Sequence, residues 1–193
     1  MVLLTAFAPF GPKGTITGTN ASEVVLDQIM ASPPKGLQSA VLTTGEAGLI
    51  SYRKLLMDGE WTGLLAMGET GGITSDHIVL ERFASVVNSP GLLPPIPWTG
   101  TEESLLAWEA TADKKGGTRS AGAYWCNRLY LEALTRAEDN GNVPAALVHV
   151  PAVLGASLPI YGKRVAPLYE RNACEVRAIL HQMEATAGSA KRP

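Results

Sequence analysis

The chain has 193 residues, a length typical of one domain. Hydrophobic residues make up 46% of it, charged residues 18%, and the formal net charge is −2, which indicates a globular protein and argues against a nucleic-acid or membrane-surface binder. The two cysteines give no disulfide framework, and the apolar run at the N-terminus is too short for a signal peptide or a membrane span, so we expect a cytoplasmic protein with reduced thiols.

The first half of the chain alternates short apolar runs with amphipathic stretches, a pattern typical of α/β proteins. Residues 2–7 are apolar except for Thr5, and Pro9 follows them, which predicts a buried strand. Asn20 begins a sequence that resembles a capping box, so we expect a helix to start there and to end before Pro33. Further along, the pattern predicts strands over residues 37–43 and 62–67 and a helix over residues 49–57.

The same patterns predict the elements in the second half of the chain. Residues 77–83 could form a strand or a short helix, and periodicity does not decide between them. Residues 89–100 contain four prolines and are predicted to be loop. The remaining predicted elements are helices over residues 101–112, 123–138 and 165–187, a buried strand over 145–150, and a disordered tail over 188–193. The predicted fold is a single domain, residues 1–187, built as a three-layer α/β/α sandwich around a mixed, largely parallel sheet.

Three residues could together perform nucleophilic acyl transfer. Cys126 stands where a turn of small residues enters a helix, and the first turn of a helix favours a thiolate. His149 ends an apolar strand, where a buried imidazole needs a hydrogen-bond partner. Glu81 lies between apolar neighbours and could orient that imidazole. Each also has a purely structural interpretation: a buried thiol, a histidine with a structural partner, or a surface carboxylate.

Other motifs are weaker. The glycine-rich segment 68–72 lacks the Lys-Ser/Thr pair that a phosphate-binding loop needs. No group of His, Cys, Asp and Glu has the spacing of metal ligands. His77 and His181 lack an apolar strand to present them. These patterns therefore indicate neither a phosphate-binding loop nor a metal site.

Six short segments resemble motifs of the pyroglutamyl peptidase I (pyrrolidone-carboxylate peptidase) family of cysteine peptidases. Residues 121–127, A-G-A-Y-W-C-N, resemble the family's nucleophile motif, and residues 148–151, V-H-V-P, its histidine motif. The Glu81-Arg82 pair resembles the family's E-R pair. The other three are T-A-F-A-P-F-G at residues 5–11, N-A-S at 20–22 and G-E-T-G-G at 68–72.

The resemblance implies a cysteine peptidase that removes an N-terminal pyroglutamyl residue from peptides, without a cofactor and as a homo-oligomer. It implies that Cys126 is the nucleophile, His149 the base and Glu81 the residue that orients His149. It further implies that Phe7, Phe10 and Tyr124 line the pocket for the pyrrolidone ring.

The chain departs from the family after Glu81. The family has an A-R-I-P-D-N segment whose arginine supports the oxyanion, and here no arginine lies between Arg82 and Arg119. Arg119 either takes over that role or is a solvated loop residue. The rebuilt segment leaves two alternatives open: an amidase or peptidase of the same fold and triad with another small acyl specificity, and a homologue that binds a lactam or peptide end without cleaving it.

Overall fold

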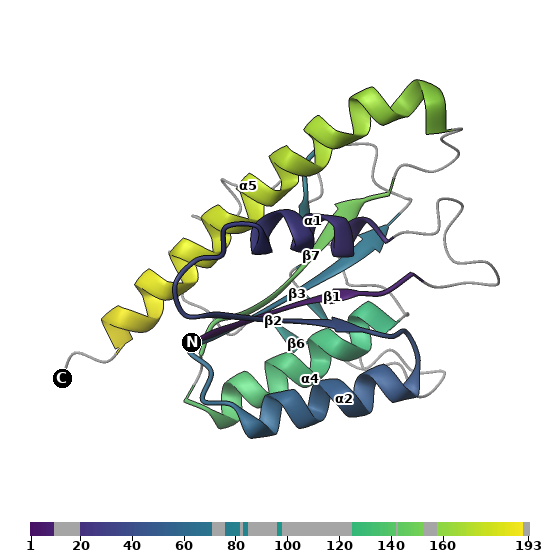
Figure 1. Ribbon diagram of the computed structural model, residues 1–193. Coiled ribbons are helices and arrows are strands. Elements are labelled where there is room, and N and C mark those ends of the chain that lie inside the picture. Colours follow the sequence, from purple (N-terminus) through teal and green to yellow (C-terminus); the bar gives the residue numbers. More distant parts are fainter. Residues whose placement is uncertain are drawn as a thin grey trace.

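The computed structural model of the chain describes residues 1–9, 20–70, 76–81, 83–84, 96–97, 125–141, 143–152 and 158–190. In this part of the chain a five-stranded sheet lies between two layers of helices (Figure 1). The N-terminus and the C-terminal end of helix α5 (Leu158–Ala190) lie on the same side of the molecule in that view. The predicted three-layer α/β/α architecture is therefore confirmed, and a second, two-stranded sheet accompanies the main one.

The sheet is mixed and largely parallel, as predicted. Its strand order is β2-β1-β3-β7-β4. The parallel strands are β1 (Val2–Phe7), β2 (Leu37–Leu42), β3 (Gly63–Thr70) and β7 (Ala145–Pro151), and the antiparallel edge strand is β4 (Val79–Glu81). The carboxyl ends of the parallel strands thus meet at one edge, which is where ligands gather in open α/β sheets.

Among the helices in the described ranges, two cover each face of the sheet. On one face lie α1 (Ala21–Met30) and α5 (Leu158–Ala190), and on the other lie α2 (Glu46–Asp58) and α4 (Trp125–Asp139) (Figure 1). Successive strand residues point to opposite faces, so both faces of each central strand must be apolar. Accordingly Leu64 and Leu147 belong to the core on the α2/α4 side, whereas Leu65 and Val148 belong to the core on the α1/α5 side.

The predicted start of α1 is confirmed. Asn20 is the N-cap, and its Oδ1 accepts hydrogen bonds from the Ser22 backbone N–H at 2.9 Å and from the Ser22 hydroxyl at 2.6 Å. The Ser22 Oγ in turn accepts from the backbone N–H of Phe7 at 3.1 Å. This chain of bonds ties the first turn of α1 to the end of β1.

Several element bounds differ from the prediction. The ambiguous stretch 77–83 contains strand β4 and the start of β5 (Phe83–Ala84). The predicted loop 89–100 is wrong at β6 (Ile96–Pro97), which pairs antiparallel with β5. A two-residue ladder can include Pro97 because it requires few donors from the backbone. Helix α5 runs from Leu158 to Ala190, so it includes three residues of the predicted tail. The predicted helix 101–112 lies outside the described residues.

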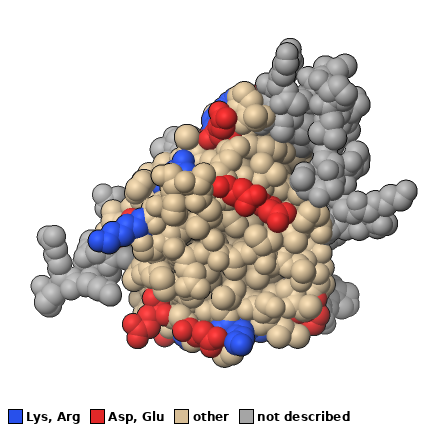
Figure 2. All heavy atoms as spheres, viewed as in Figure 1, with Lys and Arg blue, Asp and Glu red and all other residues tan. Residues whose placement is uncertain are grey.

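The surface carries charges of both signs. On the face seen in Figure 2, charged side chains lie in small groups, some of both signs, between larger neutral areas. This distribution accords with the net charge of −2. Among the described helices, none has the length and apolar character needed to cross a membrane.

Candidate active site

Three elements bring the predicted triad together on the α2/α4 face of the sheet. His149 lies near the carboxyl end of β7, and Glu81 ends the neighbouring strand β4. Cys126 is the second residue of α4, which packs over β3 and β7. The expectation that Cys126 stands in the first turn of a helix is confirmed.

Glu81 faces inward and is bonded to His149. The distance between Glu81 Oε1 and His149 Nδ1 is 2.7 Å, and the two residues are only 3% and 8% exposed. The alternative of a surface carboxylate is therefore wrong for Glu81. The reason lies in strand pairing: Glu81 lies opposite Leu147 in the antiparallel ladder, so its side chain points to the face that His149 also occupies.

The other side of the imidazole faces Cys126. Burial lowers the pKa of His149, but hydrogen bonds to Cys126 and Glu81, and the negative charge of both groups, outweigh burial and raise its pKa to about 9. Because Nδ1 is engaged with Glu81, Nε2 is the ring nitrogen left for the sulfur. The imidazole therefore lies between the Glu81 carboxylate and the Cys126 sulfur, which is the order of orienting group, base and nucleophile in acyl transfer by a thiol.

Gly68 of β3 lies next to the side chains of Cys126 and His149. It is the partner of His149 in the parallel β3–β7 ladder. A Cβ atom placed on Gly68 would lie 2.7 Å from Cys126 Sγ and 3.2 Å from His149 Nε2. From the sequence Gly68 could be assigned only to a glycine-rich motif, and the structure shows that the absence of its side chain is what gives sulfur and imidazole their space.

Glu69, the next residue of β3, points to the opposite face and connects to α1. Its Oε2 accepts a hydrogen bond of 2.5 Å from the backbone N–H of Ala21. Burial raises the pKa of Glu69, and the bond from Ala21 opposes this rise. Sequence reasoning did not single out Glu69, because a strand-to-helix contact across 48 residues leaves no local signal.

The remaining candidates divide into described and undescribed residues. Phe7 is buried at the end of β1 in the core on the α2/α4 side, so its role in a pocket stays a prediction. Phe10, Tyr124 and Arg119 lie outside the described residues. Cys126 and Cys174 are both free thiols, and Cys174 is exposed on α5.

No family model and no curated protein sequence matches the chain. Solved structures do match it over nearly its whole length. The pyrrolidone carboxyl peptidase of Thermus thermophilus is 25% identical, with a TM-score of 0.64, and the match covers 94% of this chain and 100% of that one. The fold is that of the pyrrolidone carboxyl peptidases.

Two further structures agree with this assignment of the fold. The enzyme of Fervidobacterium islandicum AW-1 is 21% identical, with a TM-score of 0.66 and coverage of 95% of this chain and 98% of the other. The enzyme of Thermococcus litoralis is 19% identical, with a TM-score of 0.67 and coverage of 95% and 94%. At these identities the comparison establishes a shared architecture, and the chemistry must be argued from the site.

Proposed function

We propose that this protein is a cysteine peptidase that removes an N-terminal pyroglutamyl residue from peptides. The observation that carries the proposal is the hydrogen-bonded series from Glu81 through His149 to Cys126 in a pyrrolidone carboxyl peptidase fold. Nucleophile, base and orienting carboxylate are the three groups that acyl transfer by a thiol requires. A cysteine with only a structural role would not require a buried imidazole bonded to it and a buried carboxylate bonded to that imidazole.

In the proposed mechanism, Cys126 Sγ attacks the carbonyl carbon of the pyroglutamyl residue. The peptide C–N bond breaks, and His149 Nε2 gives its proton to the leaving amine, so that a thioester remains on Cys126. A water molecule then attacks the thioester while His149 takes up its proton. Pyroglutamate leaves, and the Cys126 sulfur and the His149 imidazolium return to their starting state. Throughout, Glu81 holds Nδ1 of His149 and so fixes the ring orientation.

The first turn of α4 supports the proposed oxyanion site. Cys126 is the second residue of this helix, and the early backbone N–H groups of a helix have no acceptor within it. We assign the backbone N–H of Cys126 as one donor to the oxyanion. Losing an oxyanion donor typically costs about 10²–10³ in rate, so a missing arginine would make this donor more important.

A panel of chromogenic amides tests the proposal. The pyroglutamyl amide should be cleaved, whereas the prolyl and glutaminyl amides of the same leaving group should not. Cleavage of another amide in preference would replace the proposal with a different acyl specificity. If none of the three amides reacted and pyroglutamyl ligands still bound, the protein would be a binding homologue and not an enzyme.

We also propose that the protein acts in the cytoplasm and as a homo-oligomer. The two free thiols are consistent with a reducing compartment. The expectation of an oligomer rests on the resemblance to the pyroglutamyl peptidase I family. Light scattering on the purified full chain measures its mass directly, and a mass of 20.4 kDa at micromolar concentration would show a monomer.

A further inference from the structure

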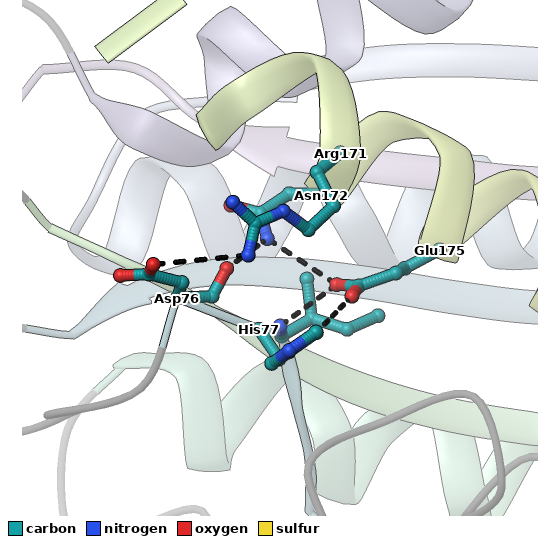
Figure 3. A network of polar contacts seen from close by, with 6 residues as sticks. Asp76, His77, Arg171, Asn172 and Glu175 are labelled. Carbon is teal, nitrogen blue, oxygen red and sulfur yellow. Dashed lines mark hydrogen bonds and ion pairs between the residues drawn. The ribbon is translucent and has the colours of Figure 1, made fainter. Parts of the chain in front are cut away.

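A group of polar side chains outside the triad joins helix α5 to the start of β4. Figure 3 shows Asn172 and Glu175, three residues apart on α5, pointing toward the segment that contains Asp76 and His77. Glu175 Oε2 accepts from the backbone N–H of Ile78 at 3.0 Å, and Glu175 Oε1 is bonded to His77 Nδ1. We call the contacts of Asn172 and Glu175 with residues 76–78 the α5 clasp.

Asn172 completes the clasp. Its Nδ2 donates to the backbone carbonyl of Asp76 at 3.0 Å and to Glu175 Oε2 at 3.2 Å, and Asn172 is fully buried. Arg171 Nη1 lies 3.7 Å from Asp76 Oδ2 at the exposed margin. Three consecutive residues are thus held by one helix face, Asp76 and Ile78 through the backbone and His77 through its side chain. An exposed ion pair contributes little, so the buried Asn172 and the partly buried Glu175, whose side chain is 12% exposed, provide the main anchorage.

The clasp holds the strand that positions Glu81. Ile78 is fully buried and directly precedes β4, which has three residues and, within the described part of the sheet, pairs with β7 alone. Glu81 lies three positions after Ile78, roughly 10 Å along an extended chain. In so short a ladder few hydrogen bonds fix the register, and a slip of one residue would turn Glu81 to the opposite face.

We propose that Glu175 is a positioning residue that anchors the start of β4 and thereby keeps the Glu81 carboxylate 2.7 Å from His149. The proposal rests on the proposed function for its catalytic meaning, since it adds a residue that acts through Glu81. A small displacement of an orienting group can cost up to about 10²-fold in rate. We therefore expect Glu175→Ala to lower kcat by about 10-fold or more, with little change in KM.

The structure offers a matched control on the same helix. Arg177, two residues after Glu175, also joins α5 to another segment, because its Nη2 donates to the carbonyls of Gln28 at 2.8 Å and Ile29 at 3.0 Å. This contact lies at the end of α1 and does not involve β4. Arg177→Ala therefore removes a comparable attachment of α5 without touching the strand that carries Glu81.

The decisive measurement is an NMR titration of His149, which needs no substrate. The chain has three histidines, so the imidazole spectrum is simple to assign by substitution. The His149 midpoint should be about 9 in the wild type, and Glu175→Ala should lower it by about one unit because the imidazolium is then held less closely by Glu81. Arg177→Ala should leave the midpoint unchanged.

Two more variants separate positioning from other effects. Glu175→Gln removes the charge but keeps an oxygen that can accept from Ile78, so it should restore the wild-type midpoint. Glu175→Asp keeps the charge but is shorter by one methylene, so it should lower the midpoint even if Glu175→Ala fails to fold. An unchanged midpoint in both the Ala and Asp variants would overturn the proposal. So would an equal shift in Glu175→Gln, which would mark a long-range charge effect. If the protein did not cleave pyroglutamyl amides, the proposed function would be contradicted. The titration of His149 would still test whether Glu175 positions Glu81.

Discussion

Gly68 and Cys126 lie so close that a single methyl group on Gly68 would come within 2.7 Å of the sulfur. Contacts shorter than 3.0 Å force something to move, and the same methyl would be 3.0 Å from His149 Cδ2. Neither neighbour can yield freely, because His149 is held by Glu81 and Cys126 is fixed on a helix. Gly68 therefore sets the separation of the two reacting side chains.

We expect Gly68→Ala to reduce kcat/KM by about 10²-fold, since a misplacement of about 1 Å at a reacting centre has effects of this size. Gly63→Ala on the same strand is the matched control. A Cβ there would meet Val2 and Met183 side-chain atoms at 3.4–3.6 Å, which is close to ordinary contact. Steady-state kinetics and thermal unfolding of both variants make the test. Full activity in Gly68→Ala would show that the site tolerates the displacement.

Cys126 should react with iodoacetamide near neutral pH well before Cys174. Cys126 is paired with an imidazole whose pKa is raised to about 9, whereas Cys174 is an exposed residue in the body of α5. Peptide mapping after brief labelling measures the ratio. Cys126→Ala should in addition abolish turnover with the fold intact, because a nucleophile has no substitute. Equal labelling of the two thiols would remove the basis for assigning Cys126 as the nucleophile.

The activity should depend on pH through His149. Its pKa is raised from 6.5 to about 9, so the imidazolium is fully formed below about pH 8 and is lost as the pH rises through 9. The ratio kcat/KM should therefore stay high up to about pH 8 and fall above about pH 9. A profile over pH 5–10.5 on a pyroglutamyl amide tests this. A decline centred near pH 6.5 would mean that His149 does not carry the partners assigned to it.

Glu81→Gln should move the same alkaline limit to lower pH. The amide keeps a hydrogen bond to Nδ1 but lacks the negative charge that raises the pKa of His149. A small part of the activity should remain, since a positioning group can be partly replaced. The pH profile of the variant, compared with the wild type, gives both quantities. An unshifted limit would show that Cys126 alone accounts for the raised pKa.

Asn20→Ala should destabilise the fold by about 1–2 kcal/mol, the usual cost of losing a side-chain N-cap. The reason is that Asn20 is fully buried and accepts two hydrogen bonds from Ser22 at the start of α1. Gln38→Ala, at an exposed polar position of β2, is the control and should change stability by less than about 0.5 kcal/mol. Urea unfolding measures both. Equal stability of the two variants would contradict the role of the cap.

Much of the scaffold could be predicted because it depends on local patterns. The apolar run that forms β1 ends two residues before Pro9, and the predicted and observed bounds agree. Cys126 lies at a helix start because small residues precede an amphipathic segment, and His149 lies on a buried strand because every neighbour in that run is apolar. Each of these features is determined within about ten residues of chain, where periodicity and helix-start signals act.

The arrangement of the site depended on contacts between distant segments. The sequence did not show whether Glu81 points inward or outward, because that depends on the antiparallel register of β4 against β7, 68 residues away. Gly68 has no side chain that could indicate its role in the sequence. Its importance follows from the closeness of Cys126 and His149. In the sequence Glu175 is one of several charged residues of α5, and its contact with Ile78 is seen only in the fold. Strand register and helix docking are set by packing of the whole core, so only the tertiary structure decides which polar side chains meet.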